Sequence, residues 1–258
     1  MEIDACWDAP QSTDVQFDEL SELFGDDSIP EEIDHRYKTT TYNQWAQPET
    51  KMMCWPYGIR HIINLSNKLT GGTIDDPRRL ANRFCNAFTT PTYNPIVSGT
   101  SLQDNMKFTR RLWLTEADYK IPVTSDIEQT KDKMMSAMSK WHFLFTGSGN
   151  IDWGKTRASK DKVAVIGSWA KHIICMIGGN KNHAIIQQSY GEQSYDKWYM
   201  YLRRDDVGAL FSVYGIIDRA MPSTLLKIRN LINKKKKVSV PKWITMNGIP
   251  TLVRQPKE

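Results

Sequence analysis

The order of helix-like and strand-like segments is the feature of this sequence that most constrains its fold. Segments with helical patterns come first, at 55–68, 75–88, 101–114 and 125–140. Short runs rich in β-branched and aromatic residues follow, and Gly, Asn and Lys separate them, at 141–145, 162–167, 172–178, 183–188 and 197–203. Such runs are typical of antiparallel strands. The order predicts an α+β protein, in which an N-terminal helical lobe packs on an antiparallel β-sheet or barrel lobe.

Two of the expected helices have recognisable start signals. The segment 75–88 opens with an Asp cap and has Pro77 at the first helical position, which is a favourable place for proline. The segment 125–140 opens with Ser125 followed three residues later by Glu128, which is the pattern of a capping box.

Charge divides the chain into regions. Residues 1–34 contain twelve of the 29 acidic residues and no Lys or Arg, so 17 acidic residues oppose the 34 basic residues of the remainder. We therefore predict three regions. These are an acidic extension (1–33), a main domain (34–222; helical lobe about 50–140, sheet lobe about 141–218) and a basic C-terminal helix and tail (223–258). The acidic extension could bind a partner or remain a solvated tail.

Several classes of protein are disfavoured. No apolar run approaches the roughly 20 residues of a membrane-spanning helix, and the N-terminus lacks the apolar core of a signal peptide. We expect no membrane association and a reducing, cytoplasmic location. The four cysteines form no CxxC pair, so neither a metal site, a cofactor nor a disulfide framework is expected. The basic run 227–237 lacks interleaved aromatic residues. We therefore expect a solvated tail there rather than a nucleic-acid binding site.

Cys54 lies where a helix is expected to begin. The N-terminus of a helix carries unpaired N–H groups and a partial positive charge, and both stabilise a thiolate. A nucleophilic thiolate also needs a histidine from elsewhere in the fold. Cys54 is therefore a candidate nucleophile. The alternative, a core cysteine such as we expect Cys85 and Cys175 to be, stays open.

The five histidines differ in their suitability as the base. His61 lies seven residues after the cysteine on the same expected helix, too far along the axis to pair with it. His142 falls inside an apolar strand, and His35 remains possible. His172 and His183 each begin an expected strand, where a base could face a cleft between lobes. The spacing alone leaves these two open.

Five motifs occur in an order that is similar to one known family. They are IPEEIDHR (29–36), CWPYG (54–58), KHIICMIGG (171–179), QQSYGE (187–192) and KWYMYLRRDD (197–206). Over residues 29–218 this series resembles the papain-like (C1-type) cysteine peptidases. The resemblance implies a two-lobe papain-like fold and a thiol peptidase or amidase that acts on a peptide or protein through a thioester intermediate.

The resemblance also implies a role for individual residues. Cys54 matches the nucleophile and His172 the base, because His172 precedes Gln188 by the family's spacing of 16 residues. Gln188 matches the asparagine that orients the catalytic histidine. Gln47, seven residues before the cysteine, matches the glutamine that binds the oxyanion. Gln44 is the alternative in the same loop.

The sequence departs from the family pattern at several positions. Gln188 is longer than the usual asparagine, and Tyr190 replaces the tryptophan that covers the bond between that asparagine and the histidine. Lys51 and Met52 replace the pattern that contains a disulfide cysteine in secreted members. These changes fit a divergent intracellular, viral or phage-type member, located in a cytoplasm, a host cytoplasm or a virion. They also permit an alternative function, a weakly active or inactive papain-like module with a structural or binding role.

Overall fold

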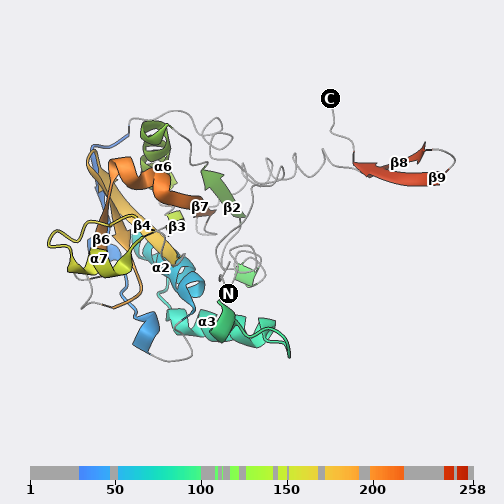
Figure 1. Cartoon of the computed structure of the whole chain (residues 1–258), viewed down its shortest axis with the longest axis horizontal. Helices are drawn as coiled ribbons and strands as arrows, with labels where there is room; N and C mark the ends of the chain where they lie inside the picture. The colour runs from blue at the N-terminus through green and yellow to red at the C-terminus, as the bar shows by residue number, and fades with distance from the viewer. Residues whose placement is uncertain are drawn as a thin grey trace.

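The computed structural model of the chain centres on an antiparallel sheet (Figure 1). It describes residues 29–46, 52–99, 108–109, 112, 117–121, 126–141, 145–149, 151–167, 172–191, 198–217, 241–246 and 249–254. The sheet order is β2-β7-β3-β4-β5-β6, and β1 pairs with β4. The strands are β1 (Glu32–Asp34), β2 (Ala117–Ile121), β3 (Phe145–Gly149), β4 (His172–Asn180), β5 (His183–Gln187), β6 (Tyr199–Arg203) and β7 (Leu210–Ile217).

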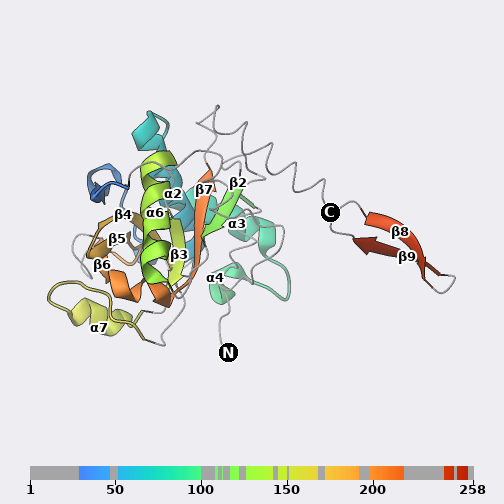
Figure 2. The ribbon, with the colours of Figure 1, turned by 90° about the horizontal axis from the view of Figure 1, so that it is seen from above.

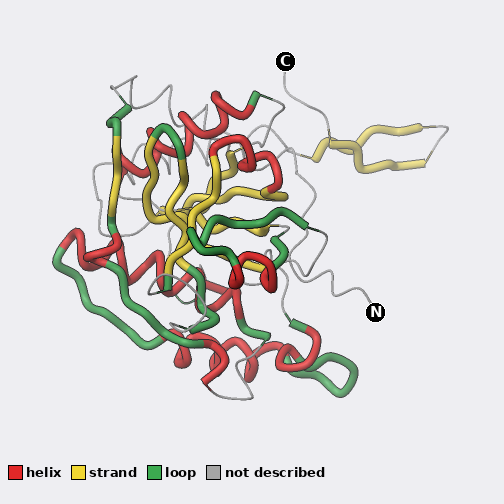
Figure 3. The backbone as a smooth tube through the Cα atoms, turned by 60° about the vertical axis from the view of Figure 1, so that its left-hand side comes forward, coloured by secondary structure: helices red, strands yellow, loops and turns green. Residues whose placement is uncertain are grey.

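Helices lie on both sides of this sheet. Figure 3 shows the strands as a central layer between helical segments, and in Figure 1 α6 lies on one side while α2 and α3 lie on the other. The helices are α2 (Cys54–Thr70), α3 (Pro77–Phe88), α4 (Pro95–Ser98), α6 (Ile127–Trp141) and α7 (Trp153–Ala158), with 3-10 turns η1 (Arg36–Lys38), η2 (Gln44–Ala46) and η5 (Arg204–Ala209). Within the described residues, none of these helices is long and apolar enough to cross a membrane.

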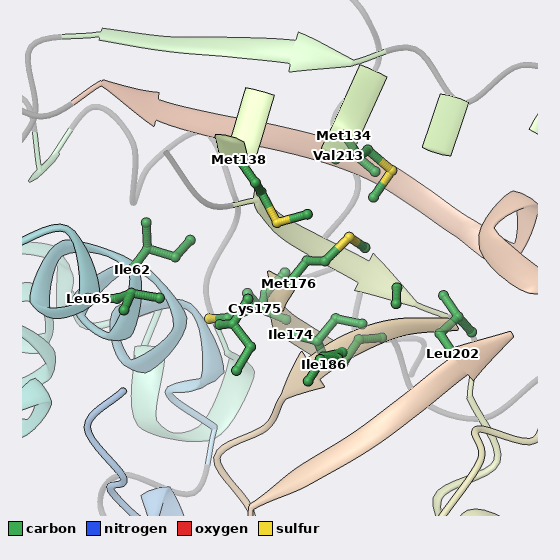
Figure 4. Close-up of a cluster of buried hydrophobic side chains, with 14 of the residues drawn as sticks. Ile62, Leu65, Met134, Met138, Ile174, Cys175, Met176, Ile186, Leu202 and Val213 are labelled. Carbon is green, nitrogen blue, oxygen red and sulfur yellow. The ribbon is translucent and has the colours of Figure 1, made fainter. Parts of the chain in front are cut away.

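The strand β4 lies at the centre of the core. Its residues 172–179 are all buried, because both faces of the strand are covered. Figure 4 shows Cys175 on the side of Ile62 and Leu65 of α2, and Met176 on the side of Met134 and Met138 of α6. Successive side chains of a strand point to opposite faces, so the continuous apolar run of β4 packs against two helices at once.

Side-chain caps and one amide pair fix the ends of the N-terminal helices. Asp76 accepts a hydrogen bond from the Arg78 N–H and precedes Pro77 at the start of α3, as the sequence predicts. Asn64 of α2 donates to the Asp75 carbonyl (2.7 Å) and accepts from the Asp75 N–H (3.1 Å). This pair holds the chain just before α3 against α2.

Several sequence-based expectations differ from the structure. Of the strand expected at 141–145, Trp141 instead ends α6, Phe145 begins β3, and residues 142–144 lie outside the described residues. The segment 162–167 makes isolated bridges (Val163–Tyr201 and Ile151–Ile166) rather than a strand. Ser125, the first residue of the expected capping box, lies outside the described residues. The carboxylate of Asp126, the residue directly before α6, accepts from the Gln129 N–H (2.9 Å).

The ends of the chain and the lobe boundary add further differences. The strand β2 lies in the segment assigned to the helical lobe, yet it pairs with β7. In the expected C-terminal tail, β8 (Pro241–Met246) and β9 (Ile249–Arg254) form a hairpin that stands apart from the sheet (Figure 2). Residues 1–28, most of the expected helix 101–114 and the expected helix 223–232 lie outside the described residues.

The strand β1 approaches β4 so closely that Gly178 is required there. Asp34 pairs with Gly178, and a Cβ atom at Gly178 would collide with the carbonyl oxygen of Ile33. The His35 N–H also donates to the Ile177 carbonyl (3.2 Å). The entry of the chain into the domain is therefore fixed on the same strand that begins with His172.

We predict that Gly178→Ala destabilises the fold by about 3 kcal/mol or more, because the added methyl group meets backbone that cannot rotate away. Gly154→Ala is the control. Gly154 is exposed in α7, where the nearest atom to an added Cβ lies 3.5 Å away, and alanine gains up to about 1 kcal/mol of helix propensity over glycine. Urea unfolding measures both variants. Equal stability of the two would contradict the close approach of β1 and β4.

Candidate active site

Cys54 is the first residue of α2 and is half-buried. It follows Met53, which is fully buried and makes no side-chain cap. The first turn contains no acidic residue to offset the positive end of the helix dipole. Because the first N–H groups of a helix have no acceptor within it, this position favours a negatively charged thiolate.

The helix that carries Cys54 packs on the strand that begins with His172. The Cys175 Sγ of β4 donates to the Gly58 carbonyl of α2 (3.1 Å). Burial raises the pKa of Cys175, and negative charge on Cys54 raises it further. The structure places Cys54 and His172 at the first positions of two elements in direct contact.

Aromatic rings surround the imidazole of His172, whose exposed fraction is 1%. Tyr190 stacks on it, with ring centroids 4.1 Å apart and planes 16° apart. Trp153, at the start of α7, meets it edge-on at 5.0 Å. The sequence identified Tyr190 but not Trp153. The local sequence around Trp153 indicates only the start of a helix, through the cap Asp152. It does not indicate the contact with His172, because that contact forms only in the tertiary fold.

The side chain of Gln188 bonds within its own turn. Its Nε2 donates to the Gly191 carbonyl (3.2 Å), and its Oε1 accepts from the Tyr190 N–H. Gln188 is buried. Within the described residues, the Nε2 atom of His172 is buried and has no hydrogen-bond partner. The structure thus brings Gln188 and His172 to the same site through Tyr190, which bonds to one and stacks on the other.

The loop that contains the glutamine candidates lies beside this turn. Gln47 lies outside the described residues. Gln44 is buried, its N–H donates to the Ser189 carbonyl (2.8 Å), and its Oε1 accepts from the Ser189 hydroxyl. With its oxygen engaged as an acceptor, the Gln44 amide presents its nitrogen as the donor end. The sequence had no local signal that would separate Gln44 from Gln47.

Two other histidines lie away from the start of β4, and a third lies outside the described residues. His183 begins β5, which pairs antiparallel with β4 near Gly179, so it lies at the opposite end of β4 from His172. His35 contacts the middle of β4 through its N–H, which donates to Ile177. His142 lies outside the described residues.

His61 is buried in the core side of α2, as a helix-face residue would be. Its ring stacks at 6.1 Å on Tyr42 and meets Tyr57 edge-on at 6.3 Å. Burial lowers the pKa of His61 from its ordinary value of 6.5 to about 4. His61 is therefore a neutral core residue at neutral pH.

Comparison with known proteins identifies the fold. No family model matches this chain, and no curated protein does. Solved structures do match. Xylellain, a cysteine protease from Xylella fastidiosa, aligns at 10% identity with a TM-score of 0.59 over 82% of this chain and 94% of that chain. Bromelain from Ananas comosus, solved with the inhibitor E64, aligns at 14% identity with a TM-score of 0.53. The alignment covers 74% of this chain and 100% of that chain.

A third match has the same character. Procathepsin L 3 from the larval midgut of Tenebrio molitor aligns at 10% identity with a TM-score of 0.52, over 75% of this chain and 71% of that chain. The structural neighbours are papain-like cysteine proteases. The chain therefore has the α+β, papain-like two-lobe fold that the sequence predicts.

We predict that His61 makes the fold sensitive to acid. Because its pKa is lower in the folded chain than in the unfolded one, protons bind the unfolded chain preferentially. This contribution to stability is complete above pH 6.5, is lost as the pH falls, and levels off below about pH 4. At pH 5 the loss from this residue is about 2 kcal/mol.

The variant His61→Phe tests this prediction, since it keeps a ring beside Tyr42 and cannot be protonated. Urea unfolding at pH 7.5 and pH 5 gives the loss of stability for each protein. The variant should lose about 2 kcal/mol less than the wild type. An equal loss in both proteins would exclude His61 as the source.

Proposed function

We propose that this chain is a thiol peptidase or amidase that hydrolyses peptide bonds, with Cys54 as nucleophile and His172 as base. One observation carries the proposal. Cys54 begins a helix that packs on the strand that begins with His172, within a fold shared with cysteine proteases. Membership of the C1-type family, in a divergent intracellular, viral or phage branch, is part of the same proposal.

The reaction proceeds in two steps. His172 takes the proton of the Cys54 thiol, and the thiolate attacks the carbonyl carbon of a peptide or protein substrate. The tetrahedral intermediate expels the amine, which receives the proton from His172, and a thioester remains on Cys54. Water, deprotonated by His172, then attacks the thioester and releases the carboxylate and the thiol. No cofactor takes part in these steps.

The oxyanion of each intermediate needs two donors. The backbone N–H of Cys54 supplies one, because it belongs to the first turn of α2. We assign the second to the Gln44 side-chain amide rather than to Gln47. Gln44 is buried against Ser189, beside the turn that contacts His172, and Ser189 fixes the orientation of its amide.

A nucleophilic thiol must stay reduced. The proposal therefore includes a reducing compartment, such as a cytoplasm, as the place of action. The alternative function, an inactive module with a binding or structural role, requires no reactivity at Cys54. Substitution of Cys54 separates the two functions.

We predict that Cys54→Ala abolishes hydrolysis of a quenched fluorescent casein and leaves the unfolding midpoint within about 1 °C, since Cys54 is only half-buried. The matched control is Cys6→Ala, which removes another thiol of the chain. Its turnover should equal that of the wild type. Casein hydrolysis that survives Cys54→Ala, or that is absent from the wild type, would refute the thiol-peptidase function.

We predict that Gln44→Glu lowers kcat by about 100- to 1,000-fold, which is the usual effect of losing one oxyanion donor. The new carboxylate keeps the acceptor for the Ser189 hydroxyl but removes the N–H donor. Gln47→Glu is the matched control and should change kcat by less than about threefold. The reverse order of effects would assign the oxyanion donor to Gln47.

A further inference from the structure

Two aromatic rings contact the imidazole of His172, whose buried Nε2 atom has no hydrogen-bond partner within the described residues. Tyr190 stacks on it at 4.1 Å, and Trp153 meets it edge-on at 5.0 Å with an angle of 90°. Trp153 and Tyr190 also touch each other edge-on, at 5.2 Å. We call these two residues the aromatic clamp. Stacked and edge-on contacts are the preferred geometries of aromatic pairs, so the clamp restricts both the tilt and the rotation of the imidazole.

The amide of Gln188 is occupied elsewhere. Both of its polar ends bond within residues 188–191, to the Gly191 carbonyl and the Tyr190 N–H. The Nε2 atom of His172 is buried without a partner in the described part of the chain. Gly191 has φ +109°, and its missing side chain leaves room for Asn43. Gln188 therefore shapes the turn that carries Tyr190 and reaches His172 only through that ring.

The other half of the clamp is also firmly held. The carboxylate of Asp152 accepts from the Lys155 N–H (3.0 Å), and the Asp152 N–H donates to the Val165 carbonyl (2.7 Å). The buried Thr156 hydroxyl accepts from the Val165 N–H (2.9 Å). These bonds tie the start and the middle of α7 to Val165, in the segment that follows the helix. Trp153 thus projects from a short helix whose position does not depend on His172.

We propose that Tyr190 and Trp153 are the positioning residues for His172, and that Gln188 acts indirectly by supporting Tyr190. The inference rests on the proposed role of His172 as the base for Cys54. Because both rings contact the imidazole directly, they restrict the direction in which its nitrogen atoms point. A base must lie in a defined geometry to take the proton of Cys54.

Alkylation of Cys54 by iodoacetamide at pH 6 tests the clamp in the full chain. Tyr190→Leu should slow the reaction by about 10- to 100-fold, because small misplacements of a catalytic group have effects of this size. Tyr190→Phe should restore it to within about threefold, and Trp153→Leu should slow it as Tyr190→Leu does. Gln188→Ala should have a smaller effect than either. Tyr37→Leu, at a tyrosine that is 73% exposed, is the control and should react like the wild type.

A spectroscopic measurement tests the clamp without relying on Cys54. In protein with ¹³C-labelled histidine, the ring signals of His172, assigned with His172→Gln, should be shifted by the ring current of Tyr190. They should move to ordinary positions in Tyr190→Leu and stay in place in Tyr190→Phe. Unmoved signals in Tyr190→Leu, or alkylation slowed as much by Gln188→Ala as by Tyr190→Leu, would overturn the proposal.

The two measurements also separate the inference from the function on which it rests. If iodoacetamide alkylates Cys54 as fast in His172→Ala as in the wild type, the proposed peptidase mechanism fails. The histidine spectra then still decide whether Tyr190 and Trp153 hold the imidazole. Should Tyr190→Leu not fold, Trp153→Leu provides the same comparison from the other side of the ring.

Discussion

The packing of α2 against β4 is the constraint on which the rest of the site depends. At Gly58 the helix has no side chain, and its carbonyl accepts directly from the Cys175 thiol. Cys54 and His172 are the first residues of these two elements. Their relation therefore follows from backbone packing in the core rather than from flexible loops, and sites built on helices and strands hold their geometry better than sites on loops.

Three further segments complete the site, and each has its own anchor in the core. The loop of Gln44 is bonded to Ser189 through backbone and side chain. The turn 188–191 is closed by the Gln188 amide, and α7 is tied to the chain at Val165. These hydrogen bonds fix the three segments to the rest of the fold. The imidazole of His172 lies where the second and third of these segments meet.

The sequence predicted those parts of the fold that local chemistry determines. Asp76 and Pro77 mark the start of α3 through local capping alone. The apolar, β-branched runs of β4, β5 and β6 favour strands through their own composition. The aromatic run at 141–145 suits a helix end as well as a strand, and α6 extends into it because that helix packs on the sheet. Gln44 and Ser189 are separated by 145 residues, and Trp153 contacts His172 only through the tertiary fold. No local pattern encodes such contacts, so the sequence could suggest Gln188 as the partner of His172 but could not show where its amide bonds.

We infer that the fold activates the thiol of Cys54. The most direct measurement treats the protein with one equivalent of an epoxysuccinyl probe at pH 6 and locates the adduct by peptide mass spectrometry. An ordinary cysteine, with a pKa of about 8.5, is almost entirely a thiol at this pH and reacts slowly. We expect rapid labelling at Cys54 alone, and its loss in His172→Ala. Labelling of Cys54 that is no faster than that of Cys6, and that does not change without His172, would contradict it.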